Sequence, residues 1–164
     1  MNRATGSDTG TREMIASVCR VPGKVVGKMR PRFTTVGGAA RAYTPKKSQE
    51  FESRVAAEYR KQGGRLHHGA VQVTVAYRRP LPKSLPRYRS GEWDEVKPDL
   101  DNVAKSVLDA LNGLAYEDDS QVVMLTAYRL PRVAGQEEEL LIKIEDADSG
   151  LRDWMGEQWQ RFTR

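Results

Sequence analysis

Hydrophobic and polar positions alternate along parts of the chain with the period of a β-strand. In AVQVTVAYRR, residues 70–79, every second residue from Val71 to Tyr77 is apolar, which is typical of a strand with one buried face. The segments IASVCRV, VVMLTAYRL and ELLIKIED are also rich in apolar and β-branched residues. We therefore predict four strands, over residues 15–21, 70–79, 122–130 and 139–146.

Three other segments repeat their apolar residues with the period of an α-helix. The first is predicted to begin at Thr44-Pro45, a threonine N-cap followed by proline, and to end before Gly63-Gly64. The second begins near Asp101, which suits the N-cap position, and ends at Asn112-Gly113. The third is a C-terminal amphipathic helix over residues 149–164. The three apolar faces hold Phe51, Val55, Ala56 and Tyr59, then Val103, Val107, Leu108 and Leu111, then Leu151, Trp154, Met155, Trp159 and Phe162.

The segments between these elements differ in composition. Residues 1–14 are polar and rich in Gly and Thr, so we expect a disordered leader. Residues 24–43 carry five cationic residues without a sustained period, and we expect a mostly irregular basic loop. Residues 79–98 form a loop rich in Pro, Arg and Lys that is too long for a simple connection.

Strands and helices mix without strict βαβ alternation, so we predict an α+β fold with a mixed sheet and packed helices. The 164 residues, 38% of them hydrophobic, suit a single domain over residues 15–148 followed by the helical extension. No stretch approaches the roughly 18 apolar residues of a membrane span, and the N-terminus lacks the apolar run of a signal peptide. The single cysteine, Cys19, excludes an intramolecular disulfide and any multi-cysteine metal site. We therefore expect a cytoplasmic protein.

Opposite charges are separated along the chain. Residues 20–91 hold 17 Lys or Arg against 3 Glu, whereas residues 92–119 hold 9 Asp or Glu against 2 Lys. A basic body suits a polyanionic partner, because each neutralised phosphate releases counterions, although a merely soluble basic surface is the alternative. The predicted phosphate contacts are Lys28, Arg30, Arg32, Arg41, Lys46 and Lys47. The long loop mixes cations with aromatic residues, which suits an unstacked base but also a mobile surface loop: Arg87, Tyr88, Arg89 and Trp93.

The acidic segment contains two pairs of carboxylates separated by the predicted second helix. Asp99 and Asp101 follow Pro98 in a segment biased toward extended geometry, in which residues two apart point to the same side. Lys105 lies one helical turn after Asp101 on the same face. Asp118-Asp119 lies between the end of the helix and the next strand. A helix folded back along that strand would return this second pair to the first.

Carboxylates gathered at one point repel each other unless a cation joins them, and oxygen ligands select Mg²⁺ or Mn²⁺. In a basic protein this predicts metal-dependent phosphodiester hydrolysis, with Lys105 supplying a fixed positive charge beside the phosphate. The alternatives are purely structural. Asp101 is then a helix cap, Asp118-Asp119 a turn, and Lys105 the partner of Asp109 in a solvated pair.

The combination KPDLDNVAKSVLDALNG followed by YEDDSQVV resembles the RusA family of Holliday-junction resolvases, endodeoxyribonucleases common in bacteriophages and prophages. The resemblance extends to VPGKVVGKMRPRF, RAYTPKKSQEFE and RPLPKS, and covers roughly residues 20–145. It implies a homodimer, dependent on Mg²⁺ or Mn²⁺, that cuts two strands symmetrically at a four-way DNA junction. The residues that match the family's catalytic groups are Asp99, Asp101, Asp119 and Lys105, with Asp118 as a supporting metal ligand. The C-terminal helix is not part of the resemblance.

Competing interpretations remain at the level of sequence. A catalytically silent or non-selective protein that binds branched DNA would keep the basic segments. An aspartate-nucleophile phosphatase is disfavoured, because the polar EWDEVKP precedes Asp99 where that chemistry needs a buried strand. GKVVGKM lacks the spacing and hydroxyl ligand of a phosphate-binding loop. His67-His68 is expected in a solvated turn rather than on a metal, and Cys19 in the core.

Overall fold

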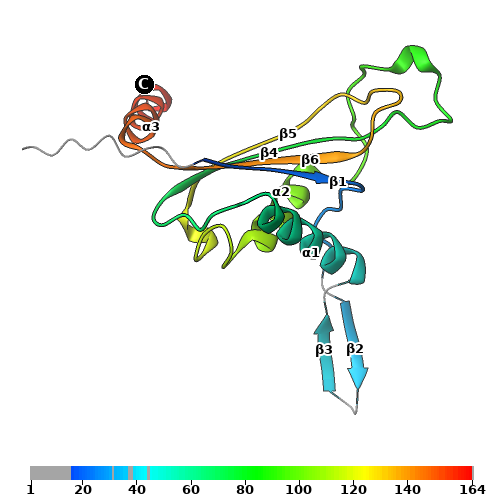
Figure 1. Cartoon of the computed structure of the whole chain (residues 1–164), viewed down its shortest axis with the longest axis horizontal. Coiled ribbons are helices and arrows are strands. Elements are labelled where there is room, and N and C mark those ends of the chain that lie inside the picture. The colour runs from blue at the N-terminus through cyan, green and yellow to red at the C-terminus, as the bar shows by residue number, and fades with distance from the viewer. Residues whose placement is uncertain (1–15, 31, 37–38, 44, 164) are drawn as a thin grey trace, which may run out of the picture.

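The central element is a four-stranded sheet of order β1-β6-β4-β5 (Figure 1). Its strands are β1 (Ala16–Pro22), β4 (Val71–Arg78), β5 (Val122–Arg129) and β6 (Glu139–Asp146). The β4–β5 pair is parallel, whereas β1–β6 and β6–β4 are antiparallel. The computed structural model describes residues 16–30, 32–36, 39–43 and 45–163, and between residues 31 and 44 it describes no side chains. All four predicted strands are confirmed.

Two helices cover one face of this sheet (Figure 1). They are α1 (Lys46–Lys61) and α2 (Leu100–Leu111), and α2 lies in the connection between the parallel strands β4 and β5. The alternating apolar residues of β4 face the helices, as their pattern predicts. This core includes Val71, Val73, Val75 and Tyr77 from β4, Phe51, Val55 and Tyr59 from α1, and Val103, Val107 and Leu111 from α2. The mixed sheet with packed helices confirms the α+β prediction.

Residues 24–43 differ from the irregular loop expected from the sequence. Strands β2 (Arg32–Val36) and β3 (Ala39–Tyr43) pair antiparallel and project from the helical side of the molecule (Figure 1). The overlooked signal is RFTTV and AARAY separated by two glycines, since a short Gly-Gly connection between β-prone runs is typical of a hairpin. The cationic residues interrupted the alternation and hid this pattern.

The long loop after β4 is ordered by backbone pairing with the segment after β5. Leu81 N–H donates to Val133 O at 3.2 Å, and Gly91 N–H donates to Arg132 O at 2.7 Å. A short 3₁₀ helix, η1 (Arg87–Arg89), lies in this arm, which extends beyond the sheet at the end remote from α3 (Ser149–Phe162) (Figure 1). The predicted leader, residues 1–14, lies outside the described residues.

Candidate nucleic-acid and metal site

The first acid pair lies at the N-terminus of α2. Asp99 is the N-cap, and its carbonyl accepts the first helical hydrogen bond, from Val103 N–H at 3.2 Å. Asp101 is in the first turn. The prediction that Asp101 caps the helix is therefore wrong by two residues. The helix begins at Leu100, which packs against the core.

The carboxylates of this pair are available to a ligand. Both Asp99 and Asp101 are exposed, and within the part of the chain that the structure describes neither carboxylate has a hydrogen bond or an ion pair. Asp99 does not use its side chain to cap the helix. Lys105 is exposed one turn further on, with Nζ 3.8 Å from Asp109 Oδ1. The ion pair between Lys105 and Asp109 that the structural alternative requires is therefore present, although it is long and exposed to solvent.

The second acid pair lies in a capped turn, η2 (Asp119–Gln121). Asp118 Oδ1 accepts from Ser120 N–H at 2.9 Å, and hydrogen bonding by the Ser120 side chain and then by this N–H lowers the pKa of the Asp118 carboxyl. Gln121 Oε1 accepts from the N–H groups of Glu117 and Asp118, at 2.7 and 3.1 Å. The sequence argument missed this role of Gln121, whose signal was the capping-box spacing D-x-x-Q. Asp119 is left exposed and without a side-chain partner among the described residues.

The two acid pairs lie at opposite ends of α2 in one chain. Gln121 Nε2 donates to Gly69 O at 2.6 Å, which places the second pair near the start of β4. Tyr77 Oη donates to Pro98 O at 3.3 Å, which places the first pair near the end of β4. Six residues of strand span about 20 Å. The expectation that α2 returns the second pair to the first is therefore wrong, and no group of three or more potential ligands forms among the described residues.

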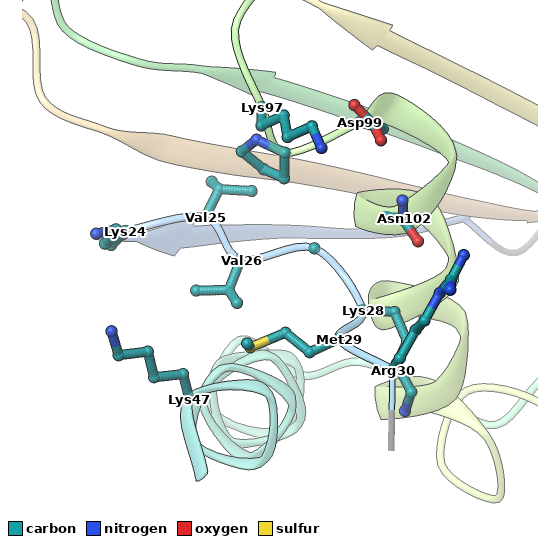
Figure 2. Close-up of a pocket in the computed structure, with 12 residues that line it drawn as sticks. Lys24, Val25, Val26, Lys28, Met29, Arg30, Lys47, Lys97, Asp99 and Asn102 are labelled. Carbon is teal, nitrogen blue, oxygen red and sulfur yellow. The ribbon is translucent and has the colours of Figure 1, made fainter. Parts of the chain in front are cut away.

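A basic pocket of about 540 Å³ lies beside the first acid pair (Figure 2). Asp99 is the acid that lines it, and its cationic lining residues are Lys24, Lys28, Arg30, Lys47 and Lys97. The sequence argument named three of these and missed Lys24 and Lys97. Their signal was proximity along the chain, since Lys97 precedes Pro98-Asp99 and Lys24 lies in the basic segment. Asp99, whose carboxylate has no hydrogen bond or ion pair among the described residues, therefore borders a pocket lined by cations.

Gly27 allows the basic segment to lie directly against the start of α2. A Cβ at this position would lie 2.9 Å from Pro98 Cβ and 3.1 Å from Asn102 Cβ, distances that force a rearrangement. The backbone is also fixed, because Lys28 N–H donates to Asn102 O at 2.8 Å. The glycine of GKVVGKM therefore serves close packing rather than a phosphate-binding loop.

The predicted phosphate contacts differ in how they are held. Lys28 Nζ lies 2.8 Å from Glu52 Oε1 and 2.7 Å from Asp109 Oδ2, so it joins α1 to α2. Burial alone would lower the pKa of Lys28, but the hydrogen bonds to both acids outweigh it and raise that pKa. Arg30 and Lys47 are exposed. The remaining positions are Lys46, 3.6 Å from Glu50; Arg87, exposed; Arg89, 2.7 Å from Glu92; and Arg32 and Arg41, whose side chains lie outside the described residues.

His67 lies in the interior rather than in the solvated turn expected for it. Its Nε2 is 3.0 Å from Ser17 Oγ, and its Nδ1 is 2.8 Å from Asp146 Oδ1. The ring therefore ties β1 to the end of β6. Its neighbour His68 is exposed, as expected, with Nδ1 3.3 Å from Glu117 Oε1.

Comparison with known proteins decides the family. The family described as endodeoxyribonuclease RusA matches residues 22–145, three quarters of the chain and both acid pairs. The chain belongs to the RusA endodeoxyribonuclease family. It is also 36% identical over 116 residues to the uncharacterized protein YqaN of Bacillus subtilis (strain 168), an overlap that covers 64% of this chain and 80% of that protein.

The RusA match also marks what lies outside the family pattern. Helix α3 begins at Ser149, after the match ends at residue 145. Both acid pairs and the residues that line the basic pocket lie within the segment that matches a family of endodeoxyribonucleases. Among the described residues, no helix is long and apolar enough to cross a membrane.

Proposed function

We propose that this protein is a metal-dependent endonuclease that resolves four-way DNA junctions by paired, symmetric cuts. The observation that carries the proposal is the free carboxylate of Asp99 on the wall of a pocket lined by five cations. Such a pocket draws in a phosphate by charge and holds it beside acids able to bind a cation. RusA membership supports the endonuclease class.

The separation of the acid pairs supports a homodimer. One chain brings two acids to each end of α2, so the four carboxylates of the family motif do not meet at one point within a single chain. Under two-fold symmetry, a second copy with its α2 antiparallel would bring its Asp118-Asp119 turn to Asp99 and Asp101. Two equivalent sites would result, which suits two coordinated cuts at a junction.

The residues fit Mg²⁺ or Mn²⁺, because every proposed ligand is a carboxylate and, among the described residues, three of the four make no competing contact. Asp99, Asp101 and Asp119 would hold the ion, with Asp118 supporting. A bound ion would polarise the phosphate and activate a water molecule. Lys105, exposed on the face of Asp101, would place its positive charge beside the scissile phosphate.

The arm formed by residues 79–98 is proposed to recognise the open centre of a junction. Tyr88 and Trp93 are 84% and 73% exposed, far more than aromatic residues of a core. Arg87 lies beside Tyr88 in η1, and Arg89 follows it. Exposed aromatic rings next to cations are suited to stacking on unpaired bases while the cations contact phosphates.

The decisive experiment compares cleavage of a synthetic four-way junction and a linear duplex, with Mg²⁺, Mn²⁺ or EDTA. Paired symmetric cuts in the junction only, abolished by EDTA, are expected. Asp101→Asn is expected to bind the junction without cutting it. Equal cutting of linear duplex would indicate a non-selective nuclease. Tight binding without cutting under any metal would indicate the silent binding protein.

Mixing two inactive variants tests the shared site. Asp101→Asn and Asp119→Asn are each expected to be inactive. Their heterodimer would contain one site with both changes and one intact site, so the mixture should nick a single strand. If each site lay within one chain, both sites of the heterodimer would carry a change and the mixture would stay inactive.

A further inference from the structure

Asp94 is a buried acid five residues before Asp99, and two arginines hold its carboxylate. It is only 5% exposed. Arg79 donates to both of its oxygens, at 2.6 and 2.7 Å, and Arg132 lies 2.5 Å from Oδ1. Burial alone would raise the pKa of Asp94, but hydrogen bonds from both arginines outweigh it and keep that pKa below its ordinary value. The carboxylate is therefore a fixed anchor for the guanidinium groups.

Arginines also hold the backbone that leads from this anchor to Asp99. Arg79 donates to Val96 O and Lys97 O, each at 2.7 Å. A third arginine, Arg129, donates to the carbonyl oxygens of Asp94, Val96 and Pro98. Four of the five carbonyls before Asp99 thus accept from a guanidinium group. A planar guanidinium group with several donors is suited to holding several neighbouring carbonyls in this way.

The arginines are themselves fixed by the sheet. Arg129 is the last residue of β5, and its Nε donates to Tyr77 Oη at 2.6 Å, in the core at the end of β4. Tyr77 Oη in turn donates to Pro98 O at 3.3 Å. Arg79 directly follows β4. Arginines at the adjoining ends of the parallel strands β4 and β5 therefore hold residues 94–98, the segment before α2, by hydrogen bonds.

Because the Asp99 carboxylate makes no hydrogen bond or ion pair within the described residues, its position depends on this backbone. We propose that Asp94, Arg79, Arg129 and Arg132 form a positioning cage that holds Asp99 in place for a divalent cation. The inference rests on the proposed function only for the identity of the ligand. The guanidinium groups of these arginines are engaged within the chain, by the Asp94 carboxylate and by backbone carbonyls.

The test uses Asp94→Asn with a matched control elsewhere in the sheet. Glu139 is also buried, 8% exposed, and is also held by two arginines, with Arg20 and Arg78 each at 2.5 Å. Glu139→Gln therefore removes an equivalent charge without touching the segment before Asp99. Amide hydrogen exchange is measured on the metal-free, full-length protein over residues 94–104. Mn²⁺ binding is measured by electron paramagnetic resonance.

Asp94→Asn is expected to speed exchange at Val96, whose N–H lies 3.4 Å from Asp94 Oδ1, and at Val103, whose N–H donates to Asp99 O. Mn²⁺ affinity is expected to fall about 10- to 100-fold, as for other residues that orient metal ligands. Glu139→Gln should change neither. Equal effects of the two variants, or unchanged exchange in Asp94→Asn, would overturn the proposal.

A substitute variant and a separate reading of the exchange data allow the test to decide the proposal in every case. If Asp94→Asn does not fold, Arg129→Lys replaces it, because lysine keeps the charge but lacks the fork that reaches several carbonyls. If the wild type binds no Mn²⁺, the proposed metal chemistry fails. The exchange data then still decide whether the cage holds Asp99.

Discussion

At the scale of single residues, the contacts of a charged side chain decide its role better than its charge does. Lys28 and Lys47 both line the basic pocket. Lys28 is held between Glu52 and Asp109, whereas Lys47 is exposed. Both are predicted as phosphate contacts from their position in a basic stretch. The structure favours Lys47 for that role and gives Lys28 a structural one as well.

Replacing Lys28 with methionine should therefore affect stability more than DNA binding. The change leaves Glu52 without its ion-pair partner and Asp109 with only the long contact to Lys105, and we expect the free energy of unfolding to fall by about 1–3 kcal/mol. Urea unfolding would measure it. The salt dependence of junction binding should stay close to that of the wild type, and a clear drop in its slope would instead make Lys28 a phosphate contact.

The low pKa of Asp94 predicts how stability depends on acid. A carboxyl whose pKa is lower in the folded than in the unfolded protein stabilises the fold at neutral pH, and that contribution disappears as pH falls through the folded pKa. Asp94→Asn should be less stable than wild type at pH 7, and the difference should shrink below about pH 4, the ordinary pKa of an aspartate. Urea unfolding at several pH values checks this, and a difference independent of pH would contradict it.

At the scale of elements, α2 carries residues of the candidate site, whereas α3 carries none of them. Both ends of α2 carry acids, while its buried face joins α1 and the sheet. None of the residues of α3 is fully buried, and Trp159 and Phe162 are 70% and 87% exposed. Helix α3 also lies beyond the RusA match. We therefore expect the elements that carry the proposed chemistry not to depend on α3.

A chain that ends after Ala147 should therefore fold and keep the metal dependence of cleavage. We expect a decrease of less than about 2 kcal/mol in the free energy of unfolding, within the range of many single substitutions. Circular dichroism and Mg²⁺ titration of junction cleavage are the measurements. A changed metal titration in a folded, truncated protein would show that α3 supports the site.

At the scale of the whole molecule, two groups of cations near Asp99 differ in what they contact. Lys24, Arg30, Lys47 and Lys97 surround an open pocket beside Asp99. Arg79, Arg129 and Arg132 face inward, onto Asp94 and the carbonyls before Asp99. The net charge of +5 counts both groups alike. Of these two groups, the first is the one available to neutralise DNA phosphates.

Salt dependence separates the two groups. The double change Lys24→Ala and Lys47→Ala should weaken junction binding and reduce the slope of log K against log salt by about 0.9 for each phosphate that is no longer neutralised. Lys61→Ala, at the other end of α1, is the matched control and should leave the slope unchanged. Equal slopes for the double variant and the control would remove the pocket from the DNA-binding surface.

The sequence alone was sufficient for the four strands of the sheet, the three helices and the α+β class. These depend on local periodicity, such as the alternation from Val71 to Tyr77 and the apolar face of α1. It also named Asp99, Asp101, Asp118 and Asp119 as candidate metal ligands from a specific motif, and that assignment stays a prediction. It was insufficient for the β2–β3 hairpin, where cationic residues broke the alternation.

Only the tertiary structure decided how these residues are arranged. The distance between the acid pairs depends on the direction of α2 relative to β4, which no local pattern encodes. The pocket depends on Gly27 lying against Pro98 and Asn102, residues about 70 positions away. The arginine cage depends on two parallel strands ending together. Each is set by contacts between segments remote in sequence, and such contacts form only when the sheet and helices pack.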